Sequence, residues 1–194
     1  MRLNTAPVFF CGIEEAMQPT DPEPVTLFCG LLSARPEVLD VAEARLADRY
    51  GPVDVRSPDI GFDFTSYYEP QMGRGLTRRF VSFARKIDPG RLAEIKRATN
   101  GLEAEAARAH AFAARPVNLD PGYLSPAKLV LASCKDRAHR IYLGLGVYAE
   151  ITLRFHGGRF RPVETTYPDY RTAEYIEFFA AVRRRHMGSR GEPV

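Results

Sequence analysis

Residues 25–36, VTLFCGLLSARP, decide the fold prediction, because they contain a strand followed at once by the start of a helix. Residues 25–32 are almost continuously apolar, and the run is too short for a typical helix, so it predicts a strand buried on both faces. Pro36 in the first turn is a helix start signal. Apolar residues then recur every three or four positions and predict one buried helical face: Leu39, Ala42, Leu46 and Tyr50. Gly51-Pro52 predicts the end of this helix.

The next elements repeat this alternation of strands and helices. We expect extended segments at residues 53–56, 62–65 and 76–87, a second helix that Asp88-Pro89 caps, and a short strand at residues 116–119. Asn100-Gly101 is a potential break within that second helix. The order β-α-β-β-α-β with short connections predicts a ferredoxin-like α+β sandwich.

The second half of the chain predicts antiparallel hairpins and a terminal helix, which extend the ferredoxin-like core. We expect strands at residues 128–134, 139–143 and 147–155, and a helix from Thr172 to about His186. Apolar and polar residues alternate strictly over residues 147–156, so the strand is predicted to bury a single apolar face.

Parity predicts the register of the first hairpin. A three-residue loop at residues 144–146 gives these cross-strand pairs: Leu143 with Val147, Tyr142 with Tyr148, Ile141 with Ala149, and Arg140 with Glu150. A two-residue loop would mix the two faces of the strands. The same register places His139 on the apolar face, opposite Ile151.

The second hairpin brings cations together. A two-residue turn at Gly157-Gly158 favours the pairs Phe155 with Phe160, His156 with Arg159, and Arg154 with Arg161. Like charges directly opposite one another are unfavourable. Either these side chains extend into water, or an anion lies between them, which would be Glu150, Glu164 or an external phosphate.

Length and composition indicate one globular domain. The chain has 194 residues, of which 45% are hydrophobic and 26% charged, and a net charge of +3 that is too balanced to imply nucleic-acid binding by itself. We expect a Pro-rich, partly disordered tail at residues 1–24, a single domain at 25–187, and a flexible C-terminus at 188–194. No apolar run reaches the roughly 20 residues of a membrane span. The three cysteines lack metal-ligand spacing, and a reducing cytoplasm fits them.

Known catalytic motifs are not found in the sequence. It contains no P-loop, no H-E-x-x-H, no C-x-x-C and no G-x-S-x-G. Gly73-Arg74-Gly75 lacks the third glycine of a dinucleotide fingerprint, yet Arg74, Arg78 and Arg79 surround backbone that could donate N–H groups to a phosphate. Carboxylates in polar loops are candidate Mg²⁺ ligands or ordinary turn residues. The turn interpretation applies above all to Asp120, because Pro121-Gly122 follows it.

Several stretches, taken in order, carry a family resemblance. They are residues 62–65 (FDFT) with Tyr67-Tyr68, 72–73 (MG) with 75–76 (GL), 80–83 (FVSF), 118–124 (NLDPGYL), 128–132 (KLVLA), 135–136 (KD) with 139–144 (HRIYLG), and 166–172 (TYPDYRT). Together they resemble the bacterial family catalogued as domain of unknown function 4416, over about residues 25–183. The resemblance implies no catalytic residues, because the family has no assigned activity.

The resemblance does mark a set of polar residues that belong to the family's motifs. They are Asp63, Tyr67, Gly73, Asn118, Asp120, Tyr123, Lys128, Lys135, Asp136, His139, Arg140, Asp169 and Arg171. Polar residues in loops are stronger candidates for function than core residues.

Our first hypothesis is a cytoplasmic protein that binds a small phosphorylated or otherwise anionic, nucleotide-like ligand, with or without Mg²⁺-assisted phosphotransfer or hydrolysis. The candidate ligand-binding residues are Arg74, Lys135, Arg140, Arg171, Tyr67, Tyr142 and Tyr148. The candidate catalytic residues are Asp120, Asp136, His139 and Asp169, and the candidate metal ligands are Asp120, Asp136 and Asp169. The enzyme hypothesis requires that Asp120, Lys135, Asp136, His139 and Asp169 face one site.

The alternative hypothesis is a non-enzymatic module that binds RNA or a protein partner. Tyr142 and Tyr148 side by side, flanked by Arg140 and Arg154, resemble the aromatic and basic sheet surfaces that stack bases. A structural or regulatory interaction protein is a third possibility. The sequence assigns no oligomeric state.

Overall fold

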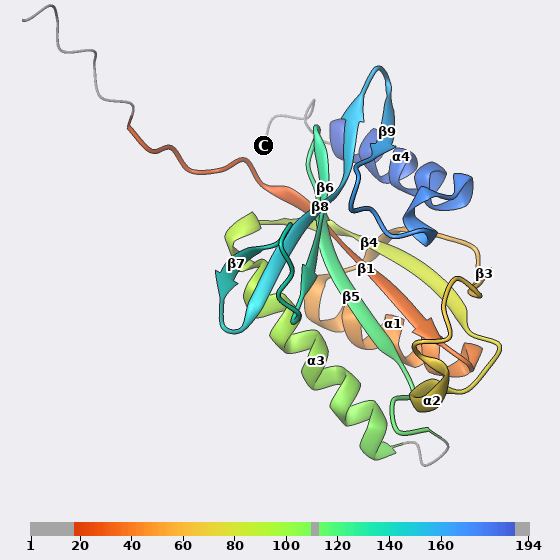
Figure 1. Ribbon diagram of the computed structural model, residues 1–194. Helices are drawn as coiled ribbons and strands as arrows, with labels where there is room; N and C mark the ends of the chain where they lie inside the picture. Colours follow the sequence, from red (N-terminus) through yellow and green to blue (C-terminus); the bar gives the residue numbers. More distant parts are fainter. Residues whose placement is uncertain (1–17, 110–112, 189–194) are drawn as a thin grey trace, which may run out of the picture.

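The computed structural model describes residues 18–109 and 113–188, and the strands in this part form one nine-stranded, antiparallel sheet (Figure 1). The strands are β1 (Val25–Ser33), β2 (Val53–Arg56), β3 (Ile60–Gly61), β4 (Thr77–Ile87), β5 (Asn118–Leu124), β6 (Lys128–Ser133), β7 (Ile141–Gly144), β8 (Val147–His156) and β9 (Arg159–Pro162). The helices are α1 (Pro36–Tyr50), α2 (Glu69–Met72), α3 (Leu92–Ala109) and α4 (Ala173–Gly188). The main strand order is β2-β4-β1-β5-β6-β8-β7, with β3 beside β4 and β9 beside β8.

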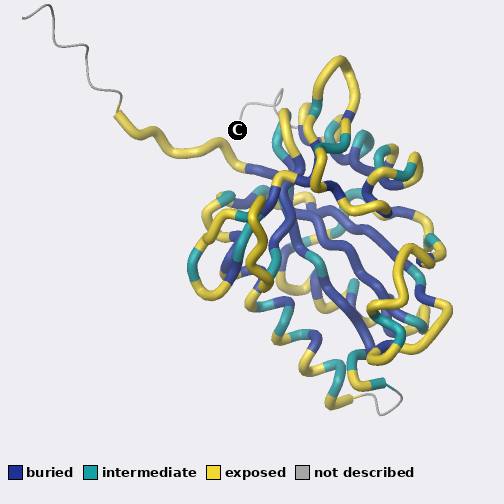
Figure 2. Tube along the Cα trace, in the orientation of Figure 1, coloured by how far each residue is buried: buried dark blue, intermediate teal, exposed yellow. Residues whose placement is uncertain are grey.

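Helices cover the two faces of the sheet unequally. Helices α1 and α3 lie on one face, where Leu39 and Ile95 join a core with Leu31 of β1. Helix α4 packs on the other face, where Phe179 meets Phe28 and Phe80 edge-on at 5.0 and 5.2 Å between ring centroids. Buried residues run along the central strands between these layers (Figure 2). The mixed α+β class is therefore confirmed.

The prediction for β5 is wrong in its bounds. Asp120-Pro121-Gly122 was expected to turn, but it lies within the strand and pairs with β1. Leu119, two residues earlier, turns its amide away from β1 towards Glu103, so the amide position of Pro121 also points away from β1, along a stretch with which β6 does not pair, and its missing N–H costs no ladder bond. A side chain at Gly122 would collide with the Val130 carbonyl oxygen and the Phe28 ring, so glycine is required there.

Other boundaries also differ. Residues 62–65 form a loop after the two-residue β3 instead of an extended strand, and α3 continues through Asn100-Gly101 without a break. The predicted strand at 139–143 begins later, as β7. Helix α4 begins as expected after Thr172, whose hydroxyl accepts a hydrogen bond from the Tyr175 amide at 3.5 Å.

A β-bulge overturns the predicted single apolar face of β8. Val130 pairs with Ile151 but the adjacent Leu129 pairs with Leu153, so β8 contains one extra residue. As a result Val147 packs on the α3 side, Leu153 packs on the α4 side, and Ile151 between them is exposed. The sequence pattern alternates correctly, but the bulge exchanges the faces halfway along the strand.

Two of the four pairs predicted for the first hairpin are confirmed, and Arg140 lies before β7, outside the strand pairing with Glu150. Tyr142 pairs with Tyr148 and Ile141 with Ala149, but Gly144 takes the place predicted for Leu143 opposite Val147. The loop is therefore two residues long, and a bulge after Tyr142 keeps the faces in phase. The β8–β9 pairs are confirmed: Phe155 with Phe160, His156 with Arg159, and Arg154 with Arg161.

The predicted tail at residues 1–24 and C-terminus at 188–194 lie mostly outside the described residues. Residues 18–24 are exposed and contain no helix or strand. Among the described residues, no helix is long and apolar enough to cross a membrane.

Candidate functional site

Polar side chains gather on the α4 side of the sheet, beyond the area that α4 covers. Gly30 of β1 pairs with both Phe80 and Asp120, so Asp120 faces the same side as the Phe80 ring beneath α4. We call this area the polar sheet face. Its members come from strands and from three loops: Arg78, Asn118, Asp120, Ser133, Glu150, Tyr67, Tyr68, Lys135, His139, Arg140, Tyr167 and Asp169.

Arg78 lies at the base of the polar sheet face and is 2% exposed. Its Nη1 donates to Oδ2 of Asp120 at 3.1 Å, and its Nη2 lies 3.9 Å from Oδ2 of Asp169. The guanidinium carbon lies 5.2 Å from the ring centroid of Phe62 and 5.7 Å from that of Phe80. Its Nε finds no hydrogen-bond partner among the described residues. One well-placed acceptor is few for a buried group with five N–H donors.

Two buried tyrosines beside Arg78 share this deficit. The hydroxyl groups of Tyr170 and Tyr175 find no hydrogen-bond partner in the described part of the chain. Their rings lie edge-on at 5.5 Å, and both contact the Phe80 ring. Burial raises the pKa of both phenols, which the positive charge of Arg78 counteracts. Arg78 Nε and the two phenol hydroxyls are therefore three buried polar groups that lie close together, each without a well-formed hydrogen bond among the described residues.

Asp120 and Asp169 respond differently to the same cation. Burial opposes the ionisation of Asp120, but Lys96 and Arg78 outweigh it and hold the Asp120 pKa below its usual value. Burial raises the pKa of Asp169, and the more distant Arg78 offsets this only in part. Asp169 is therefore the carboxyl of the pair that protonates more readily.

Helix α3 holds the edge of β5 that bears Asp120. Lys96 donates to the Leu119 carbonyl at 2.7 Å, and Glu103 accepts a hydrogen bond from the Leu119 amide at 2.8 Å. These side chains replace the strand neighbour that β6 does not provide along this stretch. Burial raises the pKa of Glu103, which Lys96 and Arg115 oppose.

A second centre forms around Glu150, which is 4% exposed. Its Oε2 accepts hydrogen bonds from Arg140 Nε and from the His139 ring Nε2, both at 2.8 Å. Arg140 also donates from Nη1 to Ser133 Oγ and the Lys135 carbonyl, and from Nη2 to the Tyr167 hydroxyl. All three guanidinium nitrogens of Arg140 are thus engaged within the protein.

Lys135 joins the loops around the polar sheet face. Its Nζ donates to the Tyr67 hydroxyl at 2.7 Å and lies 4.2 Å from the centroid of the same ring. The hydrogen bond from Lys135 lowers the pKa of Tyr67. Both side chains are exposed.

The family model described as Domain of unknown function (DUF4416) matches residues 23–186, most of the chain. The chain belongs to the DUF4416 family. The predicted resemblance is confirmed. Searches of curated proteins and of solved structures found no match.

The DUF4416 motif residues partly converge. The structure brings Tyr67, Lys135, His139, Arg140, Asp120 and Asp169 to the polar sheet face. His139 was expected on the apolar face opposite Ile151, and this is wrong, because its ring turns to Glu150. Glu150 was one candidate counter-ion for Arg154 and Arg161, but it binds His139 and Arg140 instead.

Other predicted residues lie elsewhere or serve the fold. Arg74 is on an exposed loop, 3.3 Å from Glu69, beside an open hollow of about 510 Å³ that Asp63 also lines. Arg171 donates to the carbonyls of Thr166, Val163 and Glu164, and so holds its own loop. Tyr142 and Tyr148 lie on β7 and β8 with ring centroids 5.2 Å apart.

The three candidate metal ligands do not gather in one group. Asp120 and Asp169 flank Arg78, but Asp136 is exposed on the loop after β6. Across residues 18–109 and 113–188, no group of three or more His, Cys, Asp or Glu side chains is placed to hold a metal ion.

Sequence reasoning missed the residues beneath the site. Arg78 was noted only as part of an arginine cluster near Gly73, Tyr170 only within the motif at residues 166–172, and Tyr175 only within the bounds of the predicted terminal helix. The signal for Arg78 was available, because Arg78 precedes Phe80 by two positions and so shares its face of the strand.

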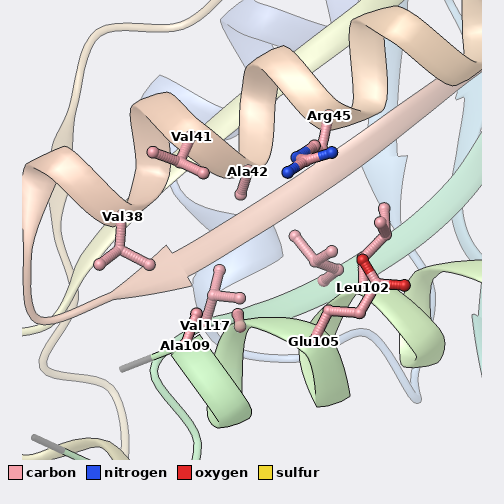
Figure 3. A pocket seen from close by; sticks show the side chains of 10 residues that line it. Val38, Val41, Ala42, Arg45, Leu102, Glu105, Ala109 and Val117 are labelled. Atoms are coloured by element: carbon pink, nitrogen blue, oxygen red, sulfur yellow. The ribbon is translucent and has the colours of Figure 1, made fainter. Parts of the chain in front are cut away.

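An apolar pocket of about 100 Å³ lies on the opposite side of the sheet, between α1 and α3 (Figure 3). Val38, Val41 and Ala42 of α1 face Leu102 and Ala109 of α3 across it, and Arg45 and Glu105 are its charged lining residues. It shares no residue with the polar sheet face.

Proposed function

We propose that this DUF4416 protein binds a small anionic ligand, one with a phosphate or carboxylate group, at the polar sheet face. The observation that carries the proposal is the buried Arg78, whose Nε has no hydrogen-bond partner among the described residues and whose Nη2 lies 3.9 Å from the Asp169 carboxylate. Guanidinium pairs with planar or tetrahedral oxyanions through two parallel hydrogen bonds. A ligand oxyanion would supply the acceptors that Arg78 lacks, and the Tyr170 and Tyr175 hydroxyls are further donors beside it.

The surroundings of Arg78 support access by an anion. The Asp120 side chain is 26% exposed, so solvent reaches the partner of Arg78. Lys135 uses one of its three N–H donors on Tyr67 and offers a second cation at the exposed side. Asp169 would repel an anion when ionised. Burial raises its pKa, so the ionised form of Asp169 is less favoured than that of Asp120.

His139, oriented by the buried Glu150, is the group best placed for proton transfer, because a carboxylate at one ring nitrogen fixes the tautomer and leaves the other nitrogen as a base. The arrangement of Asp120, Asp136 and Asp169 gives the Mg²⁺ prediction no support.

Thermal unfolding with inorganic phosphate and with AMP as probes tests this proposal. Binding at concentrations of about ten times Kd stabilises the chain by about 1.4 kcal/mol and should raise the melting temperature by roughly 3–6 °C. Lys135→Gln is expected to reduce the shift by half or more. Lys128→Gln, which removes the same charge from an exposed position on β6, is the matched control and should keep the shift. Equal shifts in the two variants, or no shift with either probe, would count against the proposal.

Single-stranded RNA binding is the second candidate, and the paired tyrosines favour it. Ser133 pairs with Tyr148, which places Tyr142 and Tyr148 on the same side of the sheet as Lys135. Stacking of one base contributes about 1–3 kcal/mol, so Tyr142→Ala should weaken binding of an oligouridine roughly tenfold in fluorescence polarisation. Leu145→Ala, at the neighbouring turn, is the control. Unchanged affinity in Tyr142→Ala excludes this mode.

We also propose that the core is ferredoxin-like and that the protein is cytoplasmic. Strands β1, β2, β4 and β5 lie in the order β2-β4-β1-β5 with α1 and α3 on one face, which supports a ferredoxin-like core. Cys29 and Cys134 are both free thiols, which supports a cytoplasmic location.

A further inference from the structure

The two edge strands of the sheet, β2 and β7, differ in how their outer edges are protected. Strand β2 ends the sheet on one side, and its Asp54 and Arg56 carry charges that are paired with neighbouring elements. Strand β7 ends it on the other side, and no strand lies along its outer edge within the described residues. Its outer row of backbone N–H and C=O groups is thus open to another strand.

The β7–β8 hairpin exposes an unusual set of apolar side chains for a sheet edge. The exposed fractions are 73% for Ile141, 59% for Tyr142, 41% for Leu143, 58% for Leu145 and 44% for Ile151. Natural edge strands are normally protected by lysine, proline or inward-pointing charges. Residues 141–149, IYLGLGVYA, contain none of these, and the protections that β7 does have are its length of four residues and the bulge after Tyr142.

The backbone at the hairpin tip is held in a costly conformation. Leu145 has φ 56°, the one positive φ outside glycine among the described residues, and its apolar side chain lies in solvent. Leucine in this left-handed region costs about 1 kcal/mol, which glycine would avoid. The two-residue turn requires a positive φ here, and it places the exposed Leu145 side chain at the tip of the sheet edge.

The charge pattern fits a second copy of the same edge. Arg140, the cation directly before β7, is 3% exposed at its side chain and is neutralised by Glu150. Two such edges, brought together antiparallel about a two-fold axis, therefore oppose no exposed like charges. Each open donor of one strand meets an open acceptor of the other, because antiparallel pairing of a strand with itself is self-complementary.

We infer that two copies of this chain associate through β7, edge to edge and antiparallel, to form one continuous sheet. The two-fold axis keeps Ile141 of both copies on the α3 side and Tyr142 of both on the other. Full burial of the five exposed side chains removes roughly 500 Å² per copy, so the pair buries on the order of 1,000 Å², the lower limit of specific interfaces. A dimer that dissociates in the micromolar range is expected.

Sedimentation equilibrium of the full chain over about 1–300 µM tests the inference, with a monomer–dimer equilibrium expected. Ile141→Lys and Ile141→Glu each place like charges near the two-fold axis and should raise the dissociation constant about tenfold or more. An equimolar mixture of the two variants should regain association. Val41→Lys adds the same charge at an exposed apolar position of α1 and should dimerise like the wild type.

Amide hydrogen exchange then separates strand pairing from other contacts. Protection of residues 141–144 should rise with protein concentration in the wild type and stay constant in Ile141→Lys. A monomer at 300 µM, a dimer that Ile141→Lys leaves intact, or a dimer without added protection in β7 would each overturn the inference. Persistent monomers with a protected β7 would show that another part of the same chain covers this edge.

Discussion

Two consecutive arginines of β4, Arg78 and Arg79, are equally buried at 2% exposure but lie on opposite faces of the sheet and in opposite states of satisfaction. Arg79 faces α1 and donates to both oxygens of Asp59, at 2.6 and 2.8 Å. It also donates to Asp40 at 2.7 Å and Glu43 at 3.0 Å. Arg78 has one hydrogen bond of this kind, to Asp120.

The number of carboxylate acceptors distinguishes Arg79, which stabilises the fold, from Arg78, which has donors available to a ligand. Burial of a guanidinium is costly, and good geometry with several carboxylates is what offsets that cost. Arg79 meets this condition and clamps α1, β4 and the loop before β3 together. Arg78 meets it only in part, so some of its binding capacity is unused in the ligand-free chain.

The largest expected effect is the loss of the Arg79 clamp. Arg79→Met removes the shared cation of three carboxylates and is expected to destabilise the protein by about 2–4 kcal/mol. The value lies below that of a fully buried network, because Asp40 is 67% exposed at its side chain and water can solvate it. Urea denaturation measures the change.

Arg56→Met is the matched control for Arg79. Arg56 contacts Asp40, Glu43 and Asp59 as well, but it is 43% exposed, so its loss should cost below about 1 kcal/mol. Equal losses in the two variants would show that the clamp depends on total charge and not on the buried guanidinium.

Removal of Arg78 should lower the free energy of unfolding less than removal of Arg79 does, but it should abolish anion binding. In Arg78→Met the side chain still packs between Phe62 and Phe80, and Asp120 keeps Asn118 as a hydrogen-bond donor at 2.6 Å and Lys96 nearby. We expect a loss of about 1–2 kcal/mol. The phosphate-dependent rise in melting temperature should disappear.

Arg79→Met provides the reference for that measurement, because it lowers stability without touching the polar sheet face. Arg79→Met should keep its phosphate shift despite the lower melting temperature. If both variants keep it, Arg78 is a structural residue like its neighbour, and the comparison between them fails.

The first half of the fold could be predicted from the sequence, because its signals are local. The apolar run of β1, the periodicity of α1 and the Asp88-Pro89 cap each depend on a few neighbouring residues. The β8 bulge could not be predicted, since it depends on how Leu129 and Val130 meet a partner strand. The Asp120-Pro121-Gly122 segment misled for the same reason: its strand conformation comes from pairing with β1 and from side chains of α3.

The candidate site was predictable in its loops and not in its base. Lys135, His139 and Asp169 stand out as polar residues within family motifs. The different roles of Arg78 and Arg79 cannot be read from a pair of adjacent arginines. They arise from which carboxylates the fold brings to each face, and those carboxylates are 20 to 91 positions away.

The smallest expected effects on stability come from Asp59, a partner of Arg79, and Asp169, which lies near Arg78, and they have opposite signs. The hydrogen bond from Arg79 lowers the pKa of Asp59, whereas burial raises the pKa of Asp169. A lowered pKa contributes stability above the unfolded value of about 3.9, which is lost as the pH falls through the folded value. A raised pKa costs stability at neutral pH, and that cost is relieved as the pH falls through the raised value.

Asp59→Asn should therefore destabilise the protein by about 0.5–1 kcal/mol at pH 7, with Asp59 partly exposed and screened, and the loss should persist at pH 4.5. Asp169→Asn should stabilise it by about 0.5 kcal/mol at pH 7, and this gain should shrink by pH 4.5, where wild-type Asp169 begins to take up its proton. Urea titrations of both variants and the wild type at the two pH values give the four differences. A loss of stability in Asp169→Asn at pH 7 would mean that its ion pair with Arg78 outweighs its burial, and Arg78 would then be as well satisfied as Arg79.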